Sequence, residues 1–128
     1  MKKDVDAAYN QREWVREEVV VLVSEYFRTK YMSNKDIKES HELISTVLRN
    51  RERCVTGLED ISDTFRNYSG IRMQSGRIRC LDPETEYDGM KGTKLQQEIM
   101  NEFLADPERI RNEAAEIIQK YEKRGNNT

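Results

Sequence analysis

The chain has 128 residues, a length that suits one domain over residues 1–128, with flexible ends expected at 1–11 and 123–128. Hydrophobic and charged residues each make up 36% of the chain. Either the hydrophobic core is small for a chain of this length, or a partner covers part of the surface. No apolar run approaches the roughly 20 residues that span a bilayer, and the N-terminus lacks the apolar middle of a signal peptide. The sequence therefore predicts a cytoplasmic protein without a membrane segment.

Cofactor and metal sites are not expected. Cys54 and Cys80 are predicted to be reduced thiols, and with the single histidine, His41, they form no zinc pattern. The acidic segment Glu84–Asp88 lacks the alternation of a calcium loop, and GMKGTK (Gly89–Lys94) is not a P-loop. Since no catalytic Ser/His/Asp or Cys/His arrangement is present either, the chain is not expected to be an enzyme.

The first two predicted helices span Arg12–Tyr31 and Ser33–Arg51. Apolar side chains of the first recur at the i, i+3/i+4 spacing of a helix face. Its β-branched run Val19–Val23 also suits a buried strand, but the flanks REE and SEYFR favour a helix. Ser33 or Asn34 is predicted to cap the second helix. The inner face of the second helix is predicted to comprise Ile37, His41, Ile44, Val47 and Leu48.

The middle of the chain predicts two shorter helices. The first is Leu58–Phe65, with Leu58, Ile61 and Phe65 as its apolar positions. The composition of Arg66–Ser69 is that of a turn. The second helix is Gly70–Leu81, capped by Ser69 and ended by Asp82-Pro83. Gly76 weakens this helix by roughly 1 kcal/mol relative to Ala, which a close approach by another backbone or a ligand would explain.

The C-terminal third predicts a polar loop and two helices. The loop ETEYDGMKGTK contains two glycines. Gly92 or Thr93 begins the helix that carries Leu95, Ile99 and Phe103. Asp106 caps the final helix, and Pro107 occupies its first position. The predicted fold class is all-α, a compact bundle of five or six helices.

Positive charge is concentrated in the middle of the chain. Residues 1–48 carry a net charge of −1 and residues 82–128 a net charge of −4, whereas residues 49–81 carry seven arginines against four acids. The stretch Thr64–Pro83 alone holds four arginines and one acid, Asp82. Arginine presents a planar fork of donors that suits phosphates and guanine edges.

Two short helices joined by a tight turn form a helix-turn-helix-like segment, with Gly70–Leu81 as its second helix. Arg72 and Arg79, seven residues apart, share one side of this helix, and Gln74 and Arg77 lie on a neighbouring strip. Lys91 and Lys94 suit secondary phosphate contacts near a helix N-terminus. The predicted DNA-binding residues are Arg66, Asn67, Arg72, Gln74, Arg77, Arg79, Lys91 and Lys94. The alternative is a solvated helix whose arginines pair with Asp60, Asp63 or Asp82.

Several blocks occur in a defined order along the chain: WVREEVVVLVSEYF (Trp14–Phe27), LISTVLRNR (Leu43–Arg51), RNYSGIRMQSGRIRCLDP (Arg66–Pro83) and GMKGTKLQQEIMNEFLADPERI (Gly89–Ile110). The most specific is Arg-Asn-x-x-Gly-Ile followed by Leu-Asp-Pro. This order resembles the N-terminal helical domain of many bacterial and phage HNH-type restriction endonucleases. The resemblance covers the chain from about Trp14 to Tyr121.

The resemblance implies a module that binds double-stranded DNA specifically, in some relatives modified DNA. It implies no nuclease here, because an HNH site needs several histidines and the chain has only His41. A nuclease domain or subunit would then be a partner, or the module acts alone. The alternative function is a helical protein-protein interaction module of a phage or mobile element, since arginine is also enriched in protein interfaces.

Overall fold

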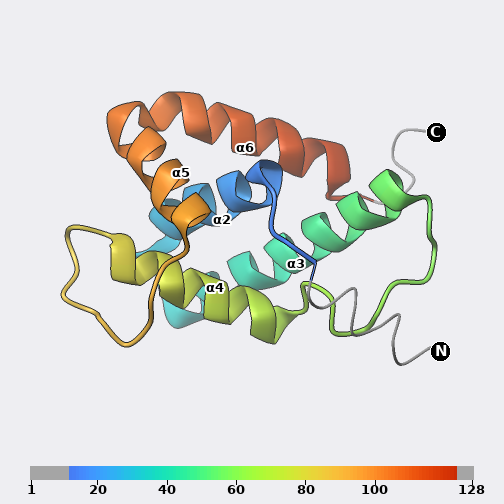
Figure 1. The fold of residues 1–128 in the computed structure, drawn as a ribbon, viewed down its shortest axis with the longest axis horizontal. Coiled ribbons are helices and arrows are strands. Elements are labelled where there is room, and N and C mark those ends of the chain that lie inside the picture. The colour runs from blue at the N-terminus through green and yellow to red at the C-terminus, as the bar shows by residue number, and fades with distance from the viewer. Residues whose placement is uncertain (1–11, 124–128) are drawn as a thin grey trace.

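The structure, a computed structural model, describes residues 12–123, which form five helices and no strand (Figure 1). The predicted all-α bundle is confirmed. None of these helices has the length and apolar character needed to cross a bilayer. The helices are α2 (Arg16–Thr29), α3 (Asn34–Thr56), α4 (Tyr68–Leu81), α5 (Lys94–Ala105) and α6 (Pro107–Tyr121).

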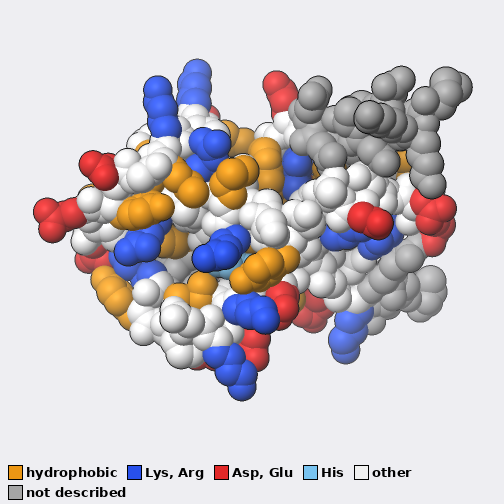
Figure 2. Space-filling view, turned by 90° about the horizontal axis from the view of Figure 1, so that it is seen from below, with side chains coloured by type: hydrophobic (Ala, Val, Ile, Leu, Met, Phe, Trp, Pro, Cys, Tyr) orange, Lys and Arg blue, Asp and Glu red, His pale blue; other side chains and the backbone are white. Residues whose placement is uncertain are grey.

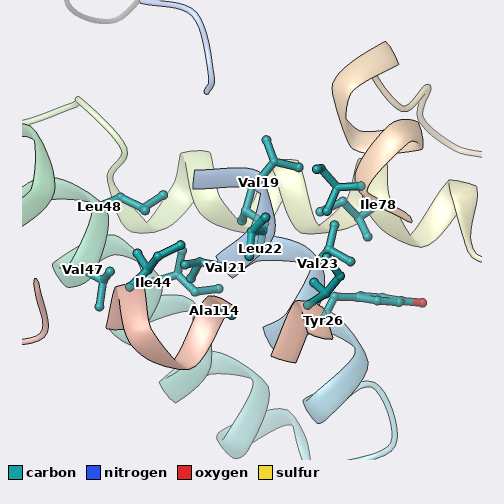
Figure 3. Close-up of a cluster of buried hydrophobic side chains, with 14 of the residues drawn as sticks. Val19, Val21, Leu22, Val23, Tyr26, Ile44, Val47, Leu48, Ile78 and Ala114 are labelled. Carbon is teal, nitrogen blue, oxygen red and sulfur yellow. The ribbon is translucent and has the colours of Figure 1, made fainter. Parts of the chain in front are cut away.

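Helix α2 is the centre of the bundle and packs against all four other helices. Each side chain of Val19–Val23 is at most 1% exposed. Figure 3 shows residues of this run among side chains from three other helices, including Ile44, Ile78 and Ala114. A helix that is apolar on all sides is one that its neighbours surround, which explains why this β-branched run resembles a buried strand in sequence.

Local capping signals confirm three predicted helix starts. The side chains of Ser33, Thr93 and Asp106 each accept a hydrogen bond from a backbone N–H in the first turn of α3, α5 and α6. Helix α4 differs from the prediction, because Asn67 and not Ser69 is its cap. The Asn67 side chain accepts a hydrogen bond of 2.9 Å from the N–H of Gly70, so the helix begins two residues earlier than predicted.

The predicted helix Leu58–Phe65 is wrong. Helix α3 ends at Thr56 and is capped by Gly57, whose φ of 74° suits glycine, and the chain then runs irregularly to α4. The side chain of Arg49 donates to the carbonyls of Ser62 and Phe65 at 2.9 and 2.6 Å. These carbonyls are thus satisfied from a neighbouring helix. The helix-turn-helix-like segment predicted here therefore lacks its first helix.

Candidate nucleic-acid interface

Helix α4 forms one wall of an open groove of about 910 Å³. The opposite walls come from the C-terminal end of α2, the first turns of α3 and the loop between α4 and α5. On the face of the molecule that carries α4, basic and hydrophobic side chains are intermixed (Figure 2). Two of the four arginines that the sequence assigns to DNA binding line this groove.

Arg72 and Arg79 both line the groove and are exposed. Neither makes an ion pair among residues 12–123. The guanidinium of Arg79 lies 4.6 Å from the ring centroid of Tyr87. Burial lowers the pKa of His41, and the nearby charge of Arg72 lowers it further. The two arginines therefore present unneutralised positive charge along one side of α4.

Gln74 and Arg77 lie instead against the segment that leads into α5. The amide of Gln96 donates to Gln74 at 2.6 Å, and Arg77 donates to the carbonyl of Lys91 at 2.7 Å. The Nε of Arg77 is buried and has no hydrogen-bond partner among residues 12–123. These two residues therefore lie at the start of α5 and not in the groove with Arg72 and Arg79. Lys91 and Lys94 are also at the start of α5 and are exposed.

Arg66 is not part of the exposed face, contrary to the sequence interpretation. Its side chain is 4% exposed and pairs with Glu18, with N–O distances of 2.8 and 3.1 Å. Its guanidinium also lies 3.8 Å from the ring centroid of Trp14 and donates to the carbonyls of Arg12 and Glu13. Asn67 is occupied as the cap of α4. Both residues therefore hold α4 in place: Arg66 is buried in its ion pair, and the side-chain oxygen of Asn67 is used by the cap.

A cluster of charged and phenolic groups, which the sequence interpretation missed, lies at the end of α4. Tyr26 donates a hydrogen bond of 2.7 Å to Asp82, and Lys30 forms ion pairs with Asp82 and Glu84. Tyr31 donates to Glu84 at 3.0 Å. Burial alone would raise the pKa of Asp82, but hydrogen bonds from Lys30 and Tyr26 hold it below the ordinary value. Within residues 12–123, Asp82 and Glu84 form their ion pairs with Lys30 and not with the groove arginines.

The apolar character of the groove was also missed. Of nine large hydrophobic side chains that are exposed in the part of the chain that the structure describes, five line this groove. They come from the α2–α3 turn, α4 and the loop after α4, so no single segment of sequence shows the pattern. The five are Tyr31, Met32, Met73, Tyr87 and Met90.

The described residues contain no group of three or more His, Cys, Asp or Glu side chains that would hold a metal ion. No protein-family model, no curated protein and no solved structure matches the chain.

Proposed function

We propose that the chain is a DNA-binding specificity module, without catalytic activity of its own, that contacts duplex DNA through the α4 face. The observation that carries the proposal is the pair Arg72 and Arg79. Both are exposed on one side of α4, and neither has an anionic partner among the described residues. Arginines that a protein leaves unneutralised are suited to phosphate oxygens or to guanine edges.

Lys91 and Lys94 extend the same face with two exposed cations, while Arg77 and Gln74 become contacts only if their hydrogen bonds to Lys91 and Gln96 open. The overall charge of −2 disfavours indiscriminate binding to a polyanion. A local basic face on a mildly acidic body suits selective binding. The resemblance to helical domains of HNH-type endonucleases supports this function, and it alone supports the recognition of modified DNA.

The second candidate function is a protein-protein interaction module. It is favoured by the exposed tyrosines and methionines of the groove, because Tyr, Met and Arg are the side chains enriched at protein interfaces. In that case the partner surface would be acidic, to complement Arg72 and Arg79.

Fluorescence anisotropy with duplex DNA over a salt series tests the proposal, with unmodified and cytosine-modified duplexes compared. The variant Arg72→Ala/Arg79→Ala is matched by Arg111→Ala/Lys120→Ala, which removes the same charge from exposed positions of α6. We expect affinity to fall with salt, and the groove variant to lose affinity and about two units of the log–log salt slope. The α6 variant should behave like the wild type.

If the groove variant and the α6 variant lose DNA affinity equally, the interface lies elsewhere or the loss reflects only the net charge. Either result would overturn the role of α4. No binding to any duplex at low salt, by protein whose circular dichroism shows it folded, would overturn DNA binding and favour the protein partner.

A further inference from the structure

Phosphate contacts explain the arginines of the groove but not its apolar lining. Tyr31 is 82% exposed, and Met32, Met73 and Met90 are each about 40% exposed around it. Water-exposed apolar surface of this kind is unfavourable in isolation and marks a binding site when it is concentrated in one place. The ligand must therefore offer a flat or apolar surface as well as negative charge.

The aromatic rings and the arginine planes of the groove suit the stacking of a flat ligand. The ring of Tyr87 already carries the guanidinium of Arg79 at 4.6 Å, and the ring of Tyr31 is the most exposed aromatic surface of the groove. Unstacked nucleobases bind on aromatic rings and on arginine planes, with phosphates held by the neighbouring cations. Arg72 and Arg79 supply such cations within the same groove.

Neutral polar groups in the groove suit the edge of a base. The side chains of Asn34, Ser69 and Ser75 line it, and none of them makes a hydrogen bond within residues 12–123. An amide and two hydroxyls offer both donors and acceptors. The only carboxylate in the lining, Glu84, is already bound by Lys30 and Tyr31. Apart from the arginines, these free polar groups are uncharged, as the edges of a base are.

From these observations we propose that the groove binds one unpaired nucleotide of DNA, with its base against Tyr31 and the methionines and its phosphates on Arg72 and Arg79. The inference rests on the proposed DNA-binding function and narrows it to an unstacked or extruded base. It differs from duplex binding alone, since a fully paired helix would leave the apolar lining unused. An acidic peptide would use the arginines and the apolar surface and would bind the neutral polar groups through its backbone amides, so it is the competing occupant that the test must exclude.

Three DNA probes of the same sequence test the inference: a paired duplex, the duplex with one unpaired 2-aminopurine nucleotide, and the single strand with 2-aminopurine. Variant Tyr31→Ala removes the ring, Tyr31→Phe keeps it, and Leu104→Ala is the control because Leu104 is 47% exposed on α5 outside the groove. Since Tyr31 is on the surface, Tyr31→Ala should fold, which circular dichroism checks.

We expect the duplex with the unpaired nucleotide to bind more tightly than the paired one, and its 2-aminopurine emission to change on binding. Tyr31→Ala should weaken binding of that probe about tenfold, the scale of one lost stacking contact, and leave the paired duplex nearly unchanged. Tyr31→Phe and Leu104→Ala should keep the preference.

Salt-dependent binding to the paired duplex without preference for the unpaired nucleotide would overturn this inference and leave the proposed function standing. Equal affinities of Tyr31→Ala and Leu104→Ala for the duplex with the unpaired nucleotide would also overturn this inference and leave the proposed function standing. Failure of all three DNA probes to bind would overturn both proposals. Tight binding of a glutamate–tyrosine copolymer in place of DNA would also overturn both and assign the groove to a protein partner.

Discussion

The guanidinium of Arg66 is paired with the carboxylate of Glu18 inside the protein, with side chains that are only 4% and 3% exposed. The pair joins α2 to the residue directly before the cap of α4. Arg66 adopts a φ of 48°, which is uncommon for a residue other than glycine, so the surrounding contacts must hold this backbone conformation in place. The orientation of α4, and with it the groove, therefore depends on an ion pair between residues 48 positions apart.

Replacing Arg66 should lower the free energy of unfolding of the whole protein. Arg66→Ala leaves the Glu18 carboxylate buried without its partner, which typically costs about 3–5 kcal/mol. The measurement is the free energy of unfolding from urea denaturation. The matched control is Arg72→Ala, an exposed arginine whose loss should change stability by no more than about 0.5 kcal/mol. Equal stability of the two variants would contradict the structural role of the pair.

Signals that act within one helical turn could be predicted from the sequence, whereas the role of Arg66 could not. Ser33, Thr93 and Asp106 cap their helices through backbone groups three residues away, so their roles follow from local sequence. The sequence assigns Arg66 to DNA binding because it belongs to the arginine-rich stretch Thr64–Pro83. Its burial depends on Glu18, which lies far away in the sequence, and nothing local indicates that pairing.

Only part of the candidate site could be predicted from the sequence, again because contacts between distant segments leave no local signal. The shared side of Arg72 and Arg79 follows from helix periodicity. The apolar lining does not, because Tyr31, Met73 and Met90 come from three segments that only the packed bundle brings together. The segment Leu58–Phe65 was predicted as a helix from its apolar spacing, but Arg49 of α3 satisfies its carbonyls instead.

The Tyr26–Asp82 hydrogen bond, 2.7 Å long, should stabilise the end of α4. Tyr26→Phe removes the hydroxyl and should cost about 1.5–3 kcal/mol, the range for a hydrogen bond to a charged group. Asp82→Ala should cost more, since it also leaves Lys30 without one of its two carboxylates. Urea denaturation measures both. Tyr31→Phe is the control, because its hydroxyl binds Glu84 at an exposed position. The prediction fails if Tyr26→Phe is as stable as Tyr31→Phe.

Two glycines near the groove should respond oppositely to alanine. A Cβ on Gly92 would overlap the side chain of Leu81, so Gly92→Ala should cost about 1–3 kcal/mol as an overpacked contact. A Cβ on Gly76 would lie 2.9 Å from the sulfur of Met90, the mobile end of a partly exposed side chain. Gly76→Ala should therefore be neutral or stabilising by up to about 1 kcal/mol, because alanine favours helix. Thermal unfolding compares the two; greater destabilisation by Gly76→Ala would contradict this packing.

Acid should weaken the contact between α2 and the junction of α5 and α6. Hydrogen bonds from Arg16 lower the pKa of Glu102 from 4.5 to about 2, with a further contribution from Arg109. A carboxylate with a lowered pKa contributes stability that is fully present above pH 4.5 and is lost as the pH falls toward 2. The stability difference between wild type and Glu102→Gln should accordingly shrink from pH 6 to pH 2 in urea denaturation. The control is Glu98→Gln, an exposed residue of α5 that forms no ion pair within residues 12–123; a pH-independent difference for Glu102→Gln would contradict the shift.

His41 offers a direct measure of the positive charge in the groove, since it is the only histidine of the chain. Burial and the charge of Arg72 hold its pKa below 6.5. An NMR titration of the imidazole should show this lowered pKa, and Arg72→Ala should raise it while burial keeps it below 6.5. Because the folded state disfavours the charged imidazole, His41 should reduce stability as the pH falls below 6.5. Addition of the DNA probe should raise the pKa of His41, since phosphates on Arg72 offset its charge. A pKa that does not respond to Arg72→Ala would contradict the proximity of the two groups.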